Sequence, residues 1–388
     1  MSGAPIISGI EVHEFEIEVP DVVQGRSGPV HKPGGQWVRK GNALRITTDQ
    51  GAIGEFVGGS PVDYAALPSF VHLLIGTNAL EREYLYTEIK RLTRQDRVGM
   101  APVDIALWDL AGKYYGAPIS ELLGGYKKTL PTYVATTHGE DADTGGLDSS
   151  EAFGDFAEQC LELGYAGFKI HGWAETTADR EIATVNAVAK RVGGKMAMML
   201  DCFNALETFG DAVLVGRACD DNEYFWYEDP YADCGLSQFA HRKLRQLVKT
   251  PLLITEHVRS LEPRVDFIVA EATDFVRGDV NYDGITSTMK LAHAAEGLGI
   301  DIEFHSPGPA QRQCIAAIRN TNFYELSLVH PLIKSYRAPV YGDGYSDDLD
   351  GIDSDGNVFA PEGAGIGVPL DWDWINAHKV DSGGLAEV

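Results

Sequence analysis

Seven ionisable residues recur along the second half of the chain, each at or near the end of a short apolar segment. Neighbouring members are 20 to 30 residues apart, about the length of one strand, one helix and two loops. In chain order they are His171, Asp201, Glu228, Glu256, Asp279, His305 and Glu325. A single carboxylate at a strand end is usually a helix cap, but seven in register indicate strand ends gathered at one rim.

Three of the carboxylates follow successive segments and form the first chemical group. Asp201, Glu228 and Glu256 would converge on one point, where three anions repel one another unless a cation lies between them. Oxygen-only ligands favour a hard ion, and Mg²⁺ fits best because it leaves positions open for water and substrate, with Mn²⁺ tolerated. His257 should face away from this group. The alternative is that the carboxylates are helix caps or surface ion pairs.

The other ionisable residues are candidates for proton transfer. Asp279 and His305 come from neighbouring segments, so the aspartate would fix the imidazole tautomer and raise its basicity. His305 is then a candidate general acid or base, and the alternative is a histidine satisfied within the core. Lys169 and His171 would leave the same face of one strand, because strand side chains alternate. They would face a metal-bound ligand from the side opposite the Asp279–His305 pair.

These side chains need a fold that brings strand ends together. From about residue 130, short apolar segments mostly alternate with amphipathic helical patterns, which predicts an α/β fold with a parallel sheet. Eight segments suggest a closed (β/α) barrel, and the competing open doubly wound sheet is disfavoured because no G-x-G-x-x-G follows an early strand. The segments are PTYVATT, GFKIHGW, AMMLDCF, EYFWYEDP, PLLITEH, DFVRGD, DIEFHS and FYELSL.

The N-terminal part of the chain has a different pattern. Residues 6–19 read as a strand, and residues 42–58 read as two strands around an Asp-Gln-Gly turn. Between them lies a glycine-rich polar segment, about residues 21–37, which contains Arg26, His31 and Lys32. It is either a plain connector or a mobile lid loop that supplies these three side chains to a substrate.

The composition narrows the classes of partner. The 388 residues include 32 Lys and Arg against 57 Asp and Glu, a formal net charge of −25. That charge argues against nucleic acid or an anionic membrane as a partner, although a bound metal would still admit a small anionic substrate. Five unpatterned cysteines favour a reducing cytoplasm. We see neither a signal-peptide pattern nor a membrane-spanning apolar stretch, so we expect a cytoplasmic protein.

Together these motifs resemble the enolase superfamily, in its mandelate racemase/muconate lactonizing enzyme subgroup. "LDCFN", "YEDP" and "TEH" are similar to the three metal-ligand strand ends, which implies that Asp201, Glu228 and Glu256 bind Mg²⁺. "VRGDVNYDGIT" and "EFHSPGP" resemble the strands of its Asp–His dyad. "FYELSLVHP" resembles the last barrel strand, where Glu325 matches a substrate-contacting glutamate. "APVDIALWDLAGKYYGAPISELLGG" resembles the helix that leads into the barrel.

The resemblance also implies an architecture. We expect a modified (β/α)7β barrel over residues 129–335 and an α+β capping domain over residues 1–128, completed by a C-terminal segment, residues 336–388. By analogy with the subgroup we expect a homo-oligomer. Two departures from the subgroup stand out. A histidine, His171, replaces the second lysine of the Lys-x-Lys pair found in racemases, and a single Gly284 replaces Gly-Gly, which affects the aim of Asp279.

The expected chemistry is removal of the proton α to a carboxylate that chelates Mg²⁺, by a Lys or His base. If the β-carbon carries a hydroxyl group, an acid protonates it and water leaves. The polar lid and the two rim histidines favour this course, dehydration of a sugar acid to a 2-keto-3-deoxy acid. The pKa of a histidine at position 171 also needs a smaller shift for proton transfer at neutral pH, because its reference value is ~6.5 against ~10.4 for lysine. Alternatives are a racemase or epimerase of a 2-hydroxy or amino acid derivative, then a cycloisomerase, then an inactive barrel with a binding or regulatory role.

Overall fold

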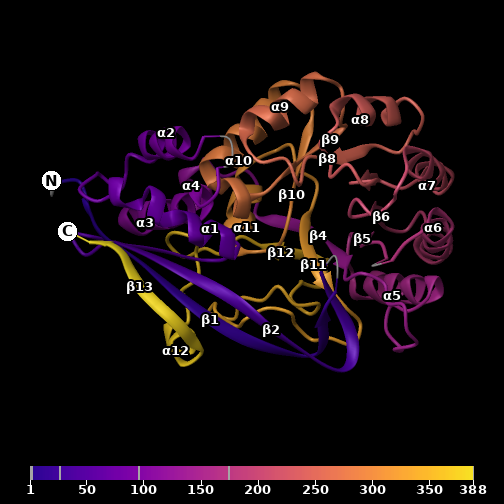
Figure 1. Cartoon of the computed structure of the whole chain (residues 1–388), viewed down its shortest axis with the longest axis horizontal. Coiled ribbons are helices and arrows are strands. Elements are labelled where there is room, and N and C mark those ends of the chain that lie inside the picture. Colours follow the sequence, from indigo (N-terminus) through magenta and orange to yellow (C-terminus); the bar gives the residue numbers. More distant parts are fainter. Residues whose placement is uncertain (1–2, 26–27, 95–96, 174, 388) are drawn as a thin grey trace.

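The computed structural model describes residues 3–387 except 26–27, 95–96 and 174, and shows a capping domain packed beside a barrel (Figure 1). The capping elements are β1 (Ile7–Gln24), β2 (Pro29–Thr48), β3 (Ile53–Val57), α1 (Pro61–Ala66), η1 (Leu67–Ser69), η2 (Val71–Leu73), α2 (Arg82–Thr93), α3 (Met100–Tyr115), α4 (Ile119–Leu122), α12 (Trp372–Ala377) and β13 (Lys379–Glu387). The barrel strands are β4 (Thr129–Thr136), β5 (Gly167–Ile170), β6 (Ala197–Asp201), β7 (Trp226–Glu228), β8 (Leu252–Ile254), β9 (Phe275–Gly278), β10 (Asp301–Phe304) and β11 (Tyr324–Val329), with β12 (Asn357–Phe359) beside β4. The barrel helices are α5 (Ser150–Leu163), α6 (Ala178–Val192), α7 (Phe209–Asp221), α8 (Gln238–Arg245), α9 (Leu261–Val269), α10 (Val280–Gly297) and α11 (Pro309–Ala317).

The capping sheet joins the two ends of the chain. Its strand order is β13-β1-β2-β3, and the pairs are antiparallel. Helix α3 packs against this sheet and is buried along most of its length, as its largely apolar sequence requires. It ends at Gly116, where φ is +68°, a left-handed conformation that glycine adopts without steric cost.

The described residues of the glycine-rich segment 21–37 are mostly strand, so the prediction of a lid loop there is wrong in its secondary structure. Strand β1 continues to Gln24 and β2 begins at Pro29, with Val22 opposite His31 and Val23 opposite Val30. The two strands form a long hairpin that reaches from the capping domain to the barrel, where Val22 packs in one cluster with Leu328 of β11 (Figure 1). Hydrogen bonds between the two backbones hold these strands together. The strands therefore do not need alternating apolar side chains, which is the pattern that predicts a strand from sequence.

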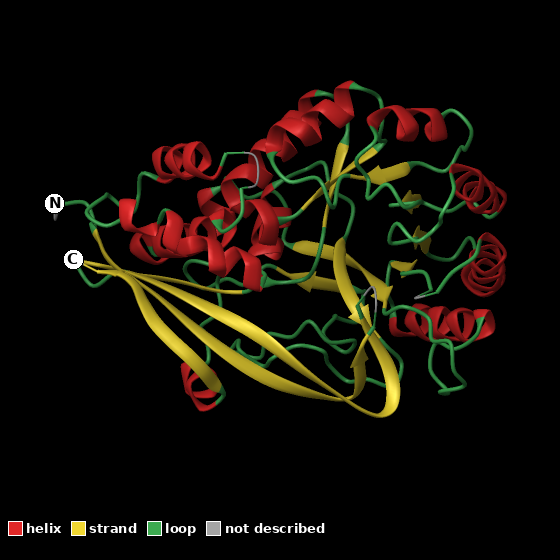
Figure 2. Ribbon diagram, in the orientation of Figure 1, coloured by secondary structure: helices red, strands yellow, loops and turns green. Residues whose placement is uncertain are grey.

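The barrel has the predicted fold class, with all eight apolar segments forming strands. The order β10-β9-β8-β7-β6-β5-β4-β11 is parallel throughout, and one helix follows each of the first seven strands. These helices lie outside the strands (Figure 2). Parallel strands place their carboxyl ends at one rim, so the predicted polar residues must gather there.

Side chains tie the seam where β10 meets β11. The buried Glu303 carboxylate on β10 accepts hydrogen bonds from the backbone N–H of Asn322 at 3.0 Å and from its side-chain amide at 2.7 Å. Farther along the seam, Glu325 accepts a hydrogen bond from the backbone N–H of Ser306 at 2.6 Å. The seam is thus closed largely by carboxylates, and one of them, Glu325, also belongs to the polar rim.

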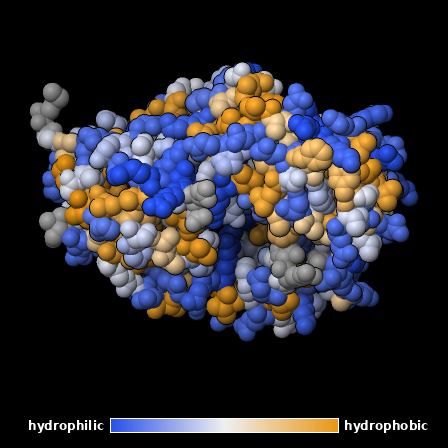
Figure 3. Space-filling view, turned by 45° about the horizontal axis from the view of Figure 1, so that its top comes forward, coloured by the Kyte–Doolittle hydropathy of each residue, from blue (hydrophilic) through white to orange (hydrophobic). Residues whose placement is uncertain are grey.

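The surface agrees with the acidic composition. Hydrophilic residues cover much of the face seen in Figure 3, and hydrophobic residues form patches scattered among them. Within the described residues, no helix combines the length and the apolar character needed to cross a membrane.

Candidate active site

The three predicted ligand carboxylates converge at the rim of the barrel. Asp201 and Glu228 end neighbouring strands and lie directly opposite each other in the β6–β7 register, and Glu256 follows β8 by two residues. All three are buried, and one carboxylate oxygen from each lies within 4.8 Å of the others. Oxygens this close suit a small hard cation, so the donor set fits the predicted ion.

Lys169 lies at the centre of this acidic group. Its ammonium Nζ is 2.8 Å from Glu228 Oε2, 2.8 Å from Glu325 Oε1 and 3.3 Å from Asp201 Oδ2. Burial lowers the pKa of Lys169, but the Glu228 and Glu325 carboxylates outweigh that effect and hold the pKa well above its ordinary value. These carboxylates therefore favour the charged form of Lys169.

A second buried cation, Arg277, was missed by the sequence analysis. It lies on β9 with no exposed surface, and its Nε is 2.9 Å from Glu228 Oε1 while its Nη2 is 2.9 Å from Glu325 Oε1. The signal was present, because Arg277 precedes Asp279 by two positions and so leaves the strand on the same face. Burial nevertheless raises the pKa of Glu228 to about 8 against the opposing effect of Arg277 and Lys169, because a charged carboxylate is costly away from water.

Asp279 and His305 form the predicted pair. Asp279 Oδ2 is 2.6 Å from His305 Nδ1, and His305 Nε2 is 3.4 Å from Glu256 Oε1. Burial lowers the pKa of His305, but the Glu256 and Asp279 carboxylates outweigh it and raise that pKa to about 9. The single Gly284 does not disturb the aim of Asp279, since the pair is formed.

His171 lies on the other side of the carboxylates. Its Nε2 is 3.6 Å from Asp201 Oδ2, and its ring stacks on that of His138 with centroids 4.3 Å apart. Burial, His138 and Lys169 together lower the pKa of His171 well below its ordinary value, so the ring is neutral at physiological pH. His138 follows the first barrel strand by two residues and could have been added to the series of strand-end residues.

The predicted substrate-binding residues of the hairpin separate in the structure. His31 is buried at the barrel, with Nδ1 3.6 Å from Glu140 Oε2 and its ring 4.6 Å from that of His330. Lys32 is exposed, as expected for the next residue along a strand. Arg26 lies outside the described residues.

The His31–Glu140–His330 cluster resembles a metal site only in composition. His330 Nδ1 accepts a hydrogen bond from the Leu332 N–H at 3.1 Å, so in the neutral ring the proton is on Nε2, which faces Glu140 Oε1 at 2.7 Å. A ring with this tautomer has no lone pair to offer a cation at Nε2. The cluster links the hairpin to the barrel through His31 and Glu140.

His257 does not turn away from the carboxylates, contrary to the prediction. Its Nε2 is 3.1 Å from Asp229 Oδ2 and 4.0 Å from Glu256 Oε1. Phe203 packs edge-on against the rings of His257, His171 and His138. An aromatic ring thus lies among three histidines at the rim.

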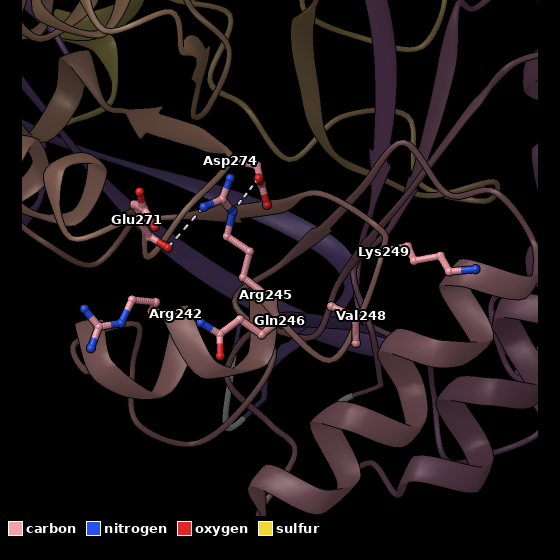
Figure 4. A pocket seen from close by; sticks show the side chains of 7 residues that line it. All are labelled: Arg242, Arg245, Gln246, Val248, Lys249, Glu271 and Asp274. Atoms are coloured by element: carbon pink, nitrogen blue, oxygen red, sulfur yellow. Dashed lines mark hydrogen bonds and ion pairs between the residues drawn. The ribbon is translucent and has the colours of Figure 1, made fainter.

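A pocket elsewhere on the barrel is not the active site. It is lined by Arg242, Arg245, Gln246, Val248, Lys249, Glu271 and Asp274 (Figure 4). These residues precede β8 and β9, so they lie at the amino ends of the strands. Arg245 is already paired with Asp274 at 2.6 Å, and the groups suited to proton transfer lie at the other end of the barrel.

The fold and the site define a barrel enzyme whose working groups stand at the carboxyl ends of its strands. The chain belongs to the mandelate racemase/muconate lactonizing enzyme family: the N-terminal domain of that family matches residues 43–124, and the enolase C-terminal domain-like family matches residues 152–374. The resemblance seen in the sequence is thereby confirmed.

Relatives in the family catalyse more than one reaction. D-xylonate dehydratase of Haloferax volcanii is 26% identical over 371 residues, covering 87% of this chain and 85% of that protein. N-succinyl-L-Arg/Lys racemase of Bacillus cereus is 26% identical over 276 residues, covering 68% of this chain and 71% of that protein. A crystal structure of D-glucarate dehydratase from Agrobacterium tumefaciens complexed with magnesium superposes with a TM-score of 0.86 at 27% identity, covering 97% and 99% of the two chains.

Proposed function

We propose that this enzyme removes the proton α to the carboxylate of a sugar acid and eliminates water, giving a 2-keto-3-deoxy acid, with Mg²⁺ bound at Asp201, Glu228 and Glu256. The observation that carries the proposal is the placement of two histidines on opposite sides of the three carboxylates. His171 Nε2 is 3.6 Å from Asp201, and His305 Nε2 is 3.4 Å from Glu256. Dehydration needs one group to take a proton and another to give one.

The acidic triplet supports a divalent metal as the cofactor. Its three carboxylates supply only oxygen ligands, and a hard ion such as Mg²⁺, or Mn²⁺ in its place, prefers these. Bound there, the metal would supply Lewis-acid stabilisation of the charge that develops on the substrate carboxylate. Lys169 adds a fixed positive charge to the same pocket, because its pKa stays high.

The two histidines divide the proton transfers. Asp279 accepts the Nδ1 proton of His305 and so directs Nε2 of that ring toward the rim. His171 is held by its stack on His138 with Nε2 toward Asp201. One ring removes the α-proton and the other protonates the leaving hydroxyl group, so the substrate lies between them.

The substrate side of the pocket is polar. The hairpin brings His31 to the barrel beside Glu140, and we propose that Arg26, His31, Lys32 and Glu325 contribute to recognition of a polyhydroxylated monoacid or diacid. The dehydratase relatives, D-xylonate dehydratase and D-glucarate dehydratase, support a substrate of this class.

Racemisation or epimerisation is the second candidate. The same two histidines could exchange the α-proton between opposite faces of the substrate, and one relative is a racemase of N-succinylated Arg and Lys. The two reactions differ in their products, because only dehydration yields a 2-keto acid.

The test is α-proton exchange and product formation in D₂O. The purified enzyme is incubated with Mg²⁺ and a panel of mono- and diacid sugars, and products are followed by NMR. We expect at least one acid to give a 2-keto-3-deoxy product in a metal-dependent manner. Exchange with inversion and no 2-keto acid would establish the racemase instead, and no exchange with any carboxylate would overturn both.

Two variants then assign the histidines. His171→Asn and His305→Asn are each tested for α-proton exchange and for loss of water. The variant that lacks the base loses exchange, whereas the variant that lacks the acid retains exchange and loses dehydration. If both variants dehydrate the substrate at the parent rate, the proposed division of roles is wrong.

A further inference from the structure

We infer that Arg277 is a positioning residue that fixes Glu228, a proposed metal ligand, and the neighbouring Glu325, and so keeps Glu228 in the orientation that a bound divalent cation requires. The inference rests on the proposed function, because it concerns the ligands of the proposed metal. It goes beyond that function because it assigns part of the metal affinity to a side chain that is not itself a metal ligand.

The contacts of Arg277 extend across the barrel interior. From β9 its guanidinium reaches Glu228 on β7 and Glu325 on β11, each at 2.9 Å, and donates a hydrogen bond to the Tyr133 hydroxyl on β4 at 3.1 Å. Its Nε is also 3.7 Å from Glu256 Oε2. Arg277 therefore contacts two of the three proposed ligands from the inner side.

The Arg277 guanidinium and the Lys169 ammonium contact different oxygens of the Glu228 carboxylate. Arg277 Nε faces Oε1 of that carboxylate, and Lys169 Nζ faces Oε2 at 2.8 Å. Both oxygens of Glu228 are thus oriented by fixed cations, and the side chain has no exposed surface. Ion pairs at both oxygens oppose rotation of this carboxylate away from the position that it takes beside Asp201 and Glu256.

The charges of the pocket agree with this assignment. Four carboxylates, those of Asp201, Glu228, Glu256 and Glu325, face the two cations Lys169 and Arg277. The carboxylates outnumber these two cations, so the pocket offers oxygen ligands to a divalent cation. Without Arg277 the carboxylates would repel one another more strongly, and their positions would depend on that repulsion.

Arginine suits this position better than lysine would. Its planar fork carries several N–H donors at fixed angles, so one side chain can hold two carboxylates and a hydroxyl group together. A lysine is a single point charge on a flexible stem, so it does not fix the direction in which each carboxylate approaches it. Replacement of Arg277 by lysine therefore keeps the charge and removes the orientation.

The test compares Arg277→Lys with Arg312→Lys as a matched control. Arg312 is also buried and paired with a carboxylate, Asp347, at 2.7 Å, but it lies on α11 against the C-terminal segment. Both variants should unfold at a lower temperature than the parent. Isothermal titration with Mg²⁺ alone should show binding about 10- to 100-fold weaker in Arg277→Lys and within twofold of the parent in Arg312→Lys.

The outcomes separate this inference from the proposed function. A parent protein that does not bind Mg²⁺ overturns the proposed function. A parent that binds Mg²⁺ together with an Arg277→Lys variant of equal affinity overturns the positioning role alone. A loss of affinity in Arg277→Lys that Arg312→Lys shares equally would also overturn it, because it would reflect general destabilisation.

A second variant covers the case in which Arg277→Lys does not fold. The double variant Arg277→Gln/Glu325→Gln removes one positive and one negative charge together, so the net charge of the pocket is unchanged. We expect it to bind Mg²⁺ at least 10-fold more weakly than the parent, whose pocket carries the same net charge. Equal affinity in these two proteins would show that Arg277 does not position the ligands.

Discussion

The Asp279 carboxylate performs two tasks with its two oxygens. Oδ2 lies 2.6 Å from His305 Nδ1, while Oδ1 accepts hydrogen bonds from the backbone N–H groups of Asn281 and Tyr282 and caps α10. Asp279 therefore caps a helix and also pairs with the histidine that we propose for proton transfer. The cap fixes the carboxylate, and the fixed carboxylate orients the histidine.

This double role makes Asp279→Asn an informative substitution. Asparagine is as good an N-cap as aspartate, so the fold and the start of α10 should persist, but the negative charge facing His305 is lost. We expect turnover to fall by about 10²- to 10⁴-fold, with circular dichroism and Mg²⁺ affinity close to those of the parent. His305→Asn should give a similar loss, and substantial residual turnover in both variants would remove the pair from the mechanism.

Removal of a single ligand charge should abolish the response to magnesium. Asp201→Asn keeps an oxygen that can accept the Phe203 N–H, which now lies 2.8 Å from Oδ1, but loses the charge. In the parent, Mg²⁺ at 100 times its Kd should add about 2.7 kcal/mol to the free energy of unfolding. We expect no such increase in Asp201→Asn, measured by thermal unfolding with and without Mg²⁺.

Glu140→Gln is the matched control for that substitution. Glu140 is a buried carboxylate near the rim, but it belongs to the His31–His330 cluster. The magnesium response should survive in this variant. If Glu140→Gln lost the response and Asp201→Asn kept it, the metal would have been assigned to the wrong cluster.

Glu303 gives a pH dependence with a defined sign. Burial raises the pKa of this seam carboxylate to about 7 from a reference value of 4.5. The folded state therefore holds a proton that the unfolded state has lost between about pH 4.5 and 7, so the contribution of Glu303 to stability falls as pH rises through that window.

The variant Glu303→Gln cannot titrate and isolates this effect. Relative to the parent, its free energy of unfolding should increase by up to about 3 kcal/mol between pH 4.5 and pH 7. Urea unfolding of both proteins at several pH values measures the difference. A constant difference across the window would show that Glu303 is already ionised in the folded protein at low pH.

Gly284 should not tolerate a side chain. Its φ of +78° and ψ of 174° interrupt α10, and a Cβ atom there would lie 2.6 Å from Asp104 Oδ2. Gly284→Ala should therefore lower the free energy of unfolding by about 3 kcal/mol. Gly297→Ala, at the end of the same helix with no atom within 4 Å of the new Cβ, should change stability by at most about 1 kcal/mol and in the opposite direction.

The strand ends of the barrel could be found from the sequence because each is a local feature. A short apolar run followed by Asp201 or Glu228 marks a buried strand and its carboxyl end, and parallel strands present those ends at one rim. The acidic triplet, the Asp279–His305 pair and the barrel itself follow from this regularity. Each of them depends on residues within a few positions of a strand end and on the rule that all such ends face the same way.

Only the tertiary structure decided which side chains meet across the barrel. Arg277 lies inside a strand, and the residues around it in the sequence do not show that Glu228 and Glu325 are its partners. His31, Glu140 and His330 come together from widely separated parts of the chain. The pairing of the strand that ends at Gln24 with the strand that begins at Pro29 is not evident from their composition. Contacts between elements depend on how the sheet closes and on where the capping domain packs. Neither the closure nor the packing can be predicted from a short stretch of sequence.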